Sequence, residues 1–360
     1  MEEFSCKVRL ISGAGTISQL ETLGARRLFL VTDPFFVQNG VAQRVAEAAK
    51  CRQVEIFDKV QPDPTVELAA EGTARLKAFD PDLVVALGGG SAMDLAKAMA
   101  YFAKGTYQVV AIPTTSGSGS EVTDFAILTH ERVKHPLVDK RLRPDMAILD
   151  SNLLQELPPK LIAEAGFDVL THAAEAYAAR EAGTVTDLYA REAFSSAYAS
   201  LPASYAGNRT VRLKVHMAAT MAGMAFSQSG LGLCHAMSHS LGGMFHVAHG
   251  RLNAILLPSV ISCNAHVAGK KYAELARAAG MGGSADTIAV RNLKNGLIRL
   301  RRELNLPETL VQAGINPRVL WRNVDAIVQA TLADPCCKSN PMVVEDFLVR
   351  RILEEVTGRV

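Results

Sequence analysis

The sequence predicts an α/β domain followed by an all-helical domain. The chain has 360 residues, which exceeds the roughly 250–300 residues at which one hydrophobic core stops growing. Up to about residue 150, short β-branched or apolar runs alternate with amphipathic helical stretches, whereas Ala-, Leu- and Met-rich helical stretches dominate after Pro158-Pro159. We therefore divide the chain into domains at 1–155 and 156–360.

The first domain is expected to hold a mostly parallel sheet, because strands that alternate with helices need crossover connections. A strand is expected directly after Met1–Ser5, and helices over 41–50 and 66–79. The cluster Asp150-Ser-Asn152 is expected to cap the first helix of the second domain. Five further runs are predicted strands: 27–32, 53–57, 83–87, 108–112 and 146–149.

Composition excludes several classes of protein. A net charge of +2, with 21% charged residues and no basic run, argues against nucleic acid as a partner. The acidic start and the lack of an 18-residue apolar stretch predict a soluble cytoplasmic protein with no membrane partner. The six cysteines lack CxxC spacing and are expected to be reduced thiols.

A glycine turn in the first domain is typical of a phosphate site. Gly88, Gly89, Gly90 and Ser91 follow the buried strand 83–87 and precede a helical stretch. Such a turn lets backbone N–H groups at a helix N-terminus approach a pyrophosphate. The alternative is a tight turn with no ligand.

Two further pieces favour a dinucleotide. Asp33 ends the strand 27–32, where a carboxylate can bind ribose hydroxyls and repel the 2′-phosphate of NADP. Thr114, Thr115 and Ser118 follow the strand 108–112, although a flexible Gly/Ser loop remains the alternative. Asp33 precedes the glycine turn, whereas in the usual Rossmann fold the ribose-binding acid follows the glycine turn by about 20 residues. We expect a Rossmann-like dinucleotide-binding domain that favours NAD.

The second domain carries a candidate metal site. Asp168 and His172 are four residues apart, as are His235 and His239, and His249 follows. Residues at this spacing share one face of a helix. Mixed imidazole and carboxylate donors suit a divalent ion such as Zn²⁺ or Fe²⁺, although any single histidine is more often an ordinary packed residue. All five residues are candidates.

The chain resembles the iron-dependent (group III) alcohol dehydrogenases over nearly its whole length. The resemblance rests on GGGSAMDLAK at 88–97, PTTSGSGSE at 113–121, GFDVLTHAAEAY at 166–177 and CHAMSHSLGGMFHVAHG at 234–250. Within the family, the sequences VRLISGAG at 8–15, DPT at 63–65 and AGMAFSQSGLGLCHAMSH at 222–239 are most similar to the 1-propanol and ethanol dehydrogenases of bacterial microcompartments.

The resemblance implies roles for individual residues. The implied ligands of Fe²⁺, with Zn²⁺ as the alternative, are Asp168, His172, His235 and His249, and His239 is implied as a catalytic proton relay. The implied NAD(H)-binding residues are Asp33, Asp63, Gly88, Gly89, Gly90, Ser91, Asp94, Thr114, Thr115, Ser118 and Lys134.

The implied activity interconverts short-chain aldehydes and primary alcohols, propanal with 1-propanol or acetaldehyde with ethanol, in the direction of aldehyde reduction. A homodimer is also implied, while residence in a microcompartment, with other microcompartment enzymes or the shell as partners, is left open. Because Met1–Ser5 is too short for an amphipathic helix of its own, encapsulation would use another surface.

Three other functions remain open. An anionic-aldehyde reductase of the sulfoacetaldehyde type would use Arg251 as its anion contact. A metal- and NAD-using lyase of the dehydroquinate synthase type would need a basic cluster, for which Arg251 and Lys134 are the candidates. The third is a non-catalytic NAD-binding protein.

The chain departs from the family near its C-terminus. Where the family has Asp-x-Cys-Thr-x-x-Asn-Pro-Arg, this chain reads Asp-Pro-Cys-Cys-Lys-Ser-Asn-Pro-Met over 334–342. Pro335, Cys337 and Met342 are the unusual residues. They leave open whether this segment faces the site, and the adjacent cysteines are expected to be packed thiols.

Overall fold

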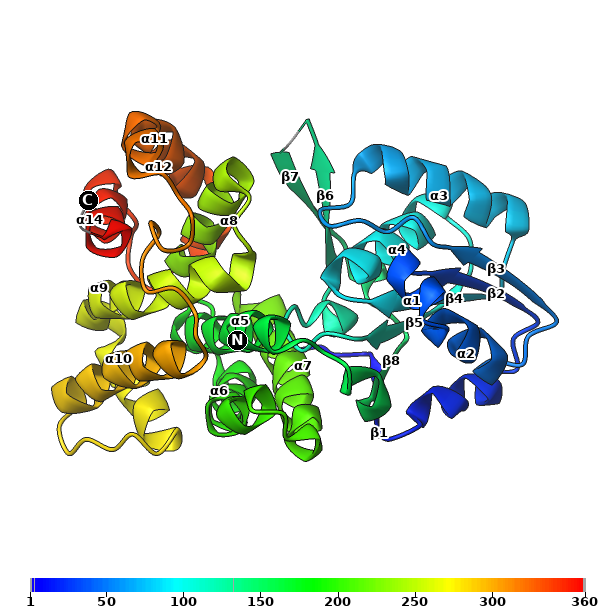
Figure 1. Ribbon diagram of the computed structural model, residues 1–360, viewed down its shortest axis with the longest axis horizontal. Helices are drawn as coiled ribbons and strands as arrows, with labels where there is room; N and C mark the ends of the chain where they lie inside the picture. Colours follow the sequence, from blue (N-terminus) through cyan, green and yellow to red (C-terminus); the bar gives the residue numbers. More distant parts are fainter. Residues whose placement is uncertain (1, 3, 132, 359–360) are drawn as a thin grey trace. The chain divides into compact units, whose positions relative to one another are not determined.

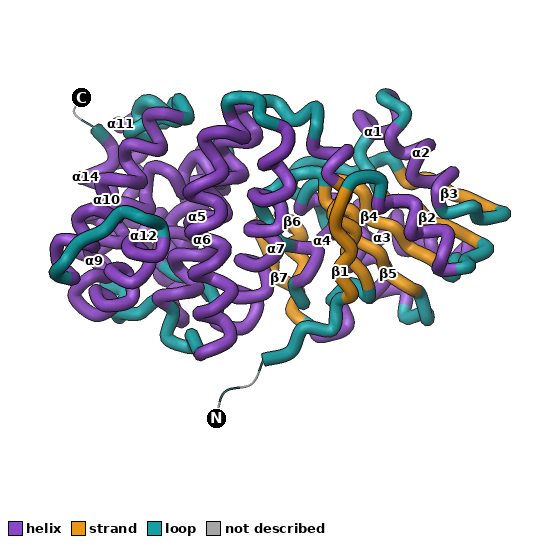
Figure 2. The backbone as a smooth tube through the Cα atoms, turned by 90° about the horizontal axis from the view of Figure 1, so that it is seen from below, coloured by secondary structure: helices purple, strands orange, loops and turns teal. Residues whose placement is uncertain are grey.

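The computed structural model describes residues 2, 4–131 and 133–358 and divides into two compact units (Figures 1 and 2). The sheet unit comprises Ser5–Leu157, and the helical unit comprises Pro158 onward together with Glu2 and Phe4. An α/β region thus precedes a helical region, as predicted. Figure 2 shows the strands gathered in the sheet unit.

Six parallel strands form the main sheet, in the order β1-β8-β5-β4-β2-β3. The central strand β4 is buried along its whole length, as expected for a parallel sheet covered on both faces. The five strands predicted from the apolar runs are confirmed, as is the strand after Ser5. The strand bounds are β1 Arg9–Gly13, β2 Arg27–Val31, β3 Gln53–Phe57, β4 Leu83–Gly88, β5 Gln108–Pro113 and β8 Met146–Asp150.

Two apolar cores cover the two faces of this sheet. Successive strand residues point to opposite faces, so Phe29 joins the core that contains α3 and α4 residues, whereas Leu28 joins the core that contains α2 residues. The helices of the unit are α1 Pro34–Gln38, α2 Val41–Ala48, α3 Val66–Phe79 and α4 Gly90–Ala103 (Figure 1). The prediction of helices near 41–50 and 66–79 is confirmed.

An antiparallel hairpin of β6 Phe125–His130 and β7 Val133–Val138 was not predicted. Its sequence is a poor strand signal, because Pro136 lies inside β7 and Lys and His residues interrupt the apolar pattern. Pro136 pairs in register with Ile127. Within the sheet unit, the hairpin places Lys134 at Asp63, as described below.

The helical unit contains only helices and loops in its described part. One prediction is wrong: Asp150 caps a short 3-10 helix, Ser151–Leu154, rather than the first helix of this unit. That helix, α5, starts at Pro159, since proline is favoured in the first turn of a helix. The helices are α5 Pro159–Ala178, α6 Thr184–Tyr205, α7 Arg212–Ser229, α8 Leu233–Phe245, α9 His249–Ala278, α10 Asp286–Glu303, α11 Pro317–Arg322, α12 Val324–Ala333, α13 Cys336–Ser339 and α14 Asp346–Thr357.

Helix α9 is long and apolar enough to cross a membrane by length and composition alone. However, 72% of its most apolar window is buried within the structure. A buried core helix passes the same test of length and composition.

His216, buried on α7, is expected to make the protein sensitive to acid. Desolvation lowers the pKa of His216 to about 4, while an unfolded histidine titrates near 6.5. The unfolded state therefore binds the proton first, so the contribution of neutral His216 is complete above pH 6.5 and is lost as the pH falls toward 4. The loss amounts to about 3 kcal/mol.

The free energy of unfolding of His216→Gln should therefore not show this loss. Relative to the wild type, we expect it to rise by about 3 kcal/mol between pH 7 and pH 4. Urea unfolding at a series of pH values measures the difference. His266→Gln, which replaces an exposed histidine on α9, serves as the control and should follow the wild-type curve. Parallel curves for His216→Gln and the wild type would contradict the prediction.

Candidate functional site

The glycine turn of the sheet unit is shaped for close approach of a ligand to its backbone. A strand precedes the turn and a helix follows it, as predicted, but strand β4 ends at Gly88 and helix α4 already begins at Gly90, so Ser91 lies in the first turn of α4. Gly88 has φ +149°, and a Cβ there would lie 2.7 Å from the Cβ of Ala92. Only glycine fits this position without strain, and the tight turn that it makes brings the chain from the end of β4 to the N-terminus of α4.

The second predicted loop lies directly against this turn. A Cβ on Gly89 would be 3.2 Å from Oγ1 of Thr115, and a Cβ on Gly90 would be 3.2 Å from the side chain of Ser118. The N–H of Thr114 donates to the carbonyl of Gly88 (2.9 Å). The two loops therefore form one continuous surface at the carboxyl ends of β4 and β5, where open α/β sheets bind ligands.

Asp33 lies at the same edge of the sheet. Its Oδ1 accepts the N–H of Phe35 (3.0 Å), and its Oδ2 is 3.7 Å from the point where a Cβ on Gly88 would lie. Burial raises the pKa of Asp33 against the opposing effect of its backbone hydrogen bonds. The predicted ribose-binding acid and the predicted phosphate turn are thus neighbours, although they are distant in sequence.

Asp94 lies on α4, just after the glycine turn, and holds the second loop by a hydrogen bond. Its Oδ1 accepts the hydroxyl of Ser120 (2.6 Å) and its Oδ2 accepts the N–H of Ile127 (3.1 Å). The buried Lys97, which sequence reasoning missed, donates to the carbonyl of Ser120 (2.9 Å) and lies 3.6 Å from Asp94. Desolvation lowers the pKa of Lys97, opposed by Asp94. Both side chains therefore fix loop geometry.

Asp63 and Lys134 form an ion pair, with Nζ of Lys134 2.7 Å from Oδ1 of Asp63. Asp63 has a left-handed backbone (φ 55°) just before α3, and Lys134 lies on β7. The two side chains are partly exposed, 59% and 38% respectively, and so remain accessible to a ligand.

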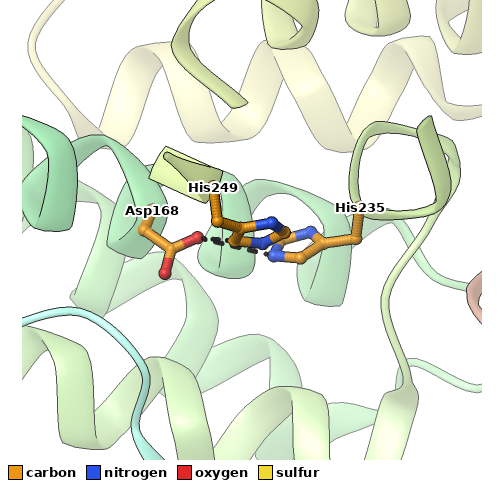
Figure 3. Close-up of side chains that lie close together, drawn as sticks. All are labelled: Asp168, His235 and His249. Atoms are coloured by element: carbon orange, nitrogen blue, oxygen red, sulfur yellow. Dashed lines mark ion pairs between the residues drawn. The ribbon is translucent and has the colours of Figure 1, made fainter. Parts of the chain in front are cut away.

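In the helical unit, four predicted ligands converge from three helices. Asp168 and His172 lie on α5, His235 on α8 and His249 at the start of α9. Oδ1 of Asp168 is 3.6 Å from Nε2 of His235, 3.6 Å from Nε2 of His249 and 3.9 Å from Nε2 of His172. Figure 3 shows the side chains of His235 and His249 directed toward the carboxylate of Asp168.

This arrangement fits a divalent metal ion. Metal–N and metal–O distances of about 2.0–2.1 Å at a tetrahedral ion place neighbouring donor atoms about 3.4 Å apart. The ligand atoms of Asp168, His235 and His249 all lie within 4.8 Å of one another, and His172 completes a set of three imidazoles and one carboxylate. Asp168, His235 and His249 thus already lie close enough to share one ion, whereas His172, which is not part of this close set, would have to move toward it.

The pKa values of the residues in this cluster depend on burial and on one another. Burial alone would raise the pKa of Asp168, but interactions with His172, His249 and His235 hold it well below its usual range. Burial lowers the pKa of His235, yet the nearby carboxylate of Asp168 and the hydrogen bond to Glu175 raise it to about 9. Desolvation, with its histidine neighbours, holds the pKa of His249 well below 6.5.

Sequence reasoning missed two buried partners of these ligands. Asn253 on α9 donates from Nδ2 to Oδ1 of Asp168 (2.7 Å). Glu175 on α5 accepts from Nδ1 of His235 (2.6 Å). Glu175 follows His172 by three residues on the same helix, so helical spacing alone could have identified it.

His239, the fifth candidate, lies beside the cluster. Its ring centroid is 5.1 Å from that of His249. Its Nδ1 is 2.8 Å from Oδ2 of Asp334. Burial would raise the pKa of Asp334, but the hydrogen bond to His239 holds it below its usual value, so the carboxylate accepts and Nδ1 donates. The segment whose orientation the sequence left open therefore does reach His239.

Arg251 is engaged by a carboxylate of its own unit. Its Nε donates to Oε1 of Glu164 (3.0 Å), and its Nη2 lies 2.5 Å from the same oxygen. Both side chains are largely buried, with 21% and 9% of their surfaces exposed. The positive charge of Arg251 is thus already compensated.

Comparisons with known proteins find relatives of both the sheet unit and the helical unit. The iron-containing alcohol dehydrogenase family matches residues 8–151, and the C-terminal region of the Fe-containing alcohol dehydrogenase family matches residues 162–357. The chain is 38% identical to 1-propanol dehydrogenase PduQ of Citrobacter freundii, over 99% of this chain and 100% of that protein. It is 34% identical to the NADPH-dependent butanol dehydrogenase of Clostridium saccharobutylicum, over 98% and 97%.

A solved structure extends the likeness to three dimensions. The sulfoacetaldehyde reductase of Bifidobacterium kashiwanohense, solved in complex with NAD⁺, matches with a TM-score of 0.89 and 26% identity, over 99% of each chain. These matches cover both the sheet unit and the helical unit. The chain therefore belongs to the iron-containing alcohol dehydrogenase family and is an enzyme of that family.

Proposed function

We propose that this enzyme reduces short-chain aldehydes, propanal or acetaldehyde, to primary alcohols with NADH and a divalent metal, Fe²⁺ in the cell and Zn²⁺ as an alternative. The observation that carries the proposal is the convergence of Asp168 with Nε2 of three histidines within 3.6–3.9 Å. Asp168, His172, His235 and His249 would hold the ion.

The two cofactors supply complementary chemistry. The metal, when bound, acts as a Lewis acid that polarises the carbonyl group of the aldehyde. The nicotinamide of NADH supplies the hydride. For the dinucleotide, Asp33 would bind the adenosine ribose, the turn Gly88–Ser91 the pyrophosphate, and Thr114, Thr115 and Ser118 the nicotinamide side, with Asp94 bracing the loops and the pair Asp63–Lys134 beside the ribose.

His239 would deliver the proton that completes the alcohol. Asp334 accepts the Nδ1 hydrogen of His239 at 2.8 Å, which fixes the orientation of the ring. Nε2 is then the nitrogen that would take up a proton from solvent, which makes the ring an imidazolium, and give that proton to the product oxygen, directly or through one water.

The test is anaerobic oxidation of NADH by protein reloaded with Fe²⁺, with metal-free protein as the control. We expect metal-dependent turnover of propanal and acetaldehyde, with sulfoacetaldehyde a poor substrate. Equal rates with and without metal would overturn the proposal. Faster turnover of the alcohols with NAD⁺ at neutral pH and cellular cofactor ratios would overturn its direction.

Asp33 is expected to set the preference for NADH. Its carboxylate beside Gly88 would face a 2′-phosphate as a like charge, which costs several kcal/mol. We therefore expect Asp33→Ser to improve kcat/KM for NADPH relative to NADH by at least about tenfold. Ser retains a hydroxyl that can cap α1. An unchanged ratio of the two kcat/KM values would contradict this assignment.

The anionic-aldehyde alternative is less well supported by the geometry. Its anion contact would be Arg251, whose charge is paired with Glu164. The lyase alternative would need a free basic cluster, and its other candidate, Lys134, is paired with Asp63. We therefore favour an uncharged short aldehyde.

We also propose that this enzyme is cytoplasmic and lies within a bacterial microcompartment, which its likeness to 1-propanol dehydrogenase PduQ supports, and that it is a homodimer. Sedimentation of the purified protein tests the dimer. Co-purification with intact microcompartments, with a cytosolic protein as the control, tests encapsulation.

A further inference from the structure

Glu175 is a buried carboxylate on the same helix as two of the proposed metal ligands. It follows Asp168 by seven residues and His172 by three on α5, which puts all three on one helical face. Only 3% of Glu175 is exposed. A carboxylate so deeply buried needs hydrogen-bond partners.

Its partners all belong to the start of helix α8. Oε1 accepts the N–H of Cys234 (2.6 Å). Oε2 accepts the N–H of Gly232 (3.1 Å) and the Nδ1 hydrogen of His235 (2.6 Å). The N–H groups in the first turn of a helix lack partners within the helix, so Glu175 caps α8. The same carboxylate also contacts His235, the proposed metal ligand on that helix.

The chain around Glu175 is built for this close approach. A Cβ on Gly232 would lie 2.8 Å from Oε1 of Glu175 and 2.9 Å from Oδ1 of Asn340, so a side chain there would displace the carboxylate. Asn340 accepts the N–H of Leu233 (3.1 Å). The first turn of α8 is therefore fixed by two side chains, of which only Glu175 reaches an imidazole.

We propose that Glu175 is a positioning residue that orients His235 for metal binding; this inference rests on the proposed metal function. An ionised carboxylate can only accept hydrogen bonds, so its contact requires a hydrogen on Nδ1 of His235. In the neutral ring, the form that binds a metal, Nε2 then carries the free lone pair, and Nε2 lies 3.6 Å from Oδ1 of Asp168. The contact selects the tautomer that can bind the ion.

Glu175→Gln separates this role from simple packing. The glutamine has the same shape but only one oxygen. If its NH₂ group faces His235, Nδ1 must become the acceptor and the hydrogen moves to Nε2, where it blocks the metal. If its NH₂ group faces Cys234 instead, it opposes a backbone N–H. Either arrangement weakens the contact that orients His235.

The experiment titrates metal-free protein with Zn²⁺ in competition with a chromophoric chelator. We expect the Kd of Glu175→Gln to be 10- to 100-fold weaker than that of the wild type, as for other partners of metal-binding histidines. The visible spectrum of bound Co²⁺ should also change. Glu274→Gln is the matched control, because Glu274 accepts from Tyr177 on the same helix α5 (2.8 Å) and should bind both metals as the wild type does.

The outcomes separate this inference from the proposed function. If the wild type binds neither Zn²⁺ nor Co²⁺ at the site, the proposed function fails first. If the wild type binds and Glu175→Gln binds equally well, with only the melting temperature of the metal-free protein lowered, Glu175 is a packing residue and the inference is wrong. If Glu175→Gln fails to fold, Gly232→Ala is tested instead, because the added methyl group would displace the carboxylate of Glu175. A Kd for Zn²⁺ unchanged in Gly232→Ala would also overturn the inference.

Discussion

Asp168→Asn is expected to lower aldehyde reduction by about 10³-fold, the largest effect of any substitution proposed here. Nε2 of each of the three proposed ligand histidines lies within 3.6–3.9 Å of Oδ1 of Asp168. The amide keeps the shape but removes the single negative charge of the donor set, and the polarisation that a metal provides is worth several kcal/mol. About 4 kcal/mol corresponds to 10³-fold in rate.

Metal content after dialysis and kcat with propanal measure this effect. Asp187→Asn is the control, because Asp187 also pairs with a basic group in the helical unit, Lys271 (2.9 Å), but lies outside the cluster. Circular dichroism of each variant shows whether the helical unit is retained. A folded Asp168→Asn protein with full metal content and a normal rate would contradict the assignment of this residue as a ligand.

His239→Ala is expected to lower kcat by about 10²-fold or more while leaving metal content intact. General acid catalysis by a positioned side chain contributes 10²- to 10⁴-fold, and His239 is oriented by Asp334 but is not one of the four converging ligands. Because the metal would still bind the substrate, KM for the aldehyde should change much less than kcat.

His246→Asn is the control for this experiment. His246 ends the same helix in a left-handed conformation (φ 55°), which asparagine tolerates, and it is exposed. This variant should retain wild-type kcat. If His239→Ala instead lost its metal together with its activity, His239 would act as a ligand. If it retained full kcat, the proton would come from another group.

The sequence predicted the strands and loops of the sheet unit well because their signals are local. The buried run of β4, the glycines after it and Asp33 at the end of β2 each have a physical reason that lies within a few residues. The hairpin β6–β7 was missed for the same reason, because its pairing depends on neighbours and its own residues, including Pro136, are poor strand formers.

The residues of the proposed metal cluster could be predicted in pairs, since i and i+4 spacing on a helix is also local. Its supporting residues were not. Asn253 reaches Asp168 from a helix 85 residues away, and Asp334 reaches His239 across 95 residues. Hydrogen bonds of this kind depend on how helices pack, which no short pattern encodes. Glu175 is the exception, because it follows His172 by three residues and could have been identified from this helical spacing.

Helix α8 has one further consequence, for attempts to redesign this enzyme. It carries both His235 and His239, so the proposed ligand and the proposed proton donor belong to one rigid rod. With 3.6 residues per turn, inserting a single residue between them would rotate His239 by about 100° about the helix axis. Substitutions along α8 can therefore change the surroundings of these groups, whereas insertions and deletions would separate the proposed proton donor from the proposed metal centre altogether.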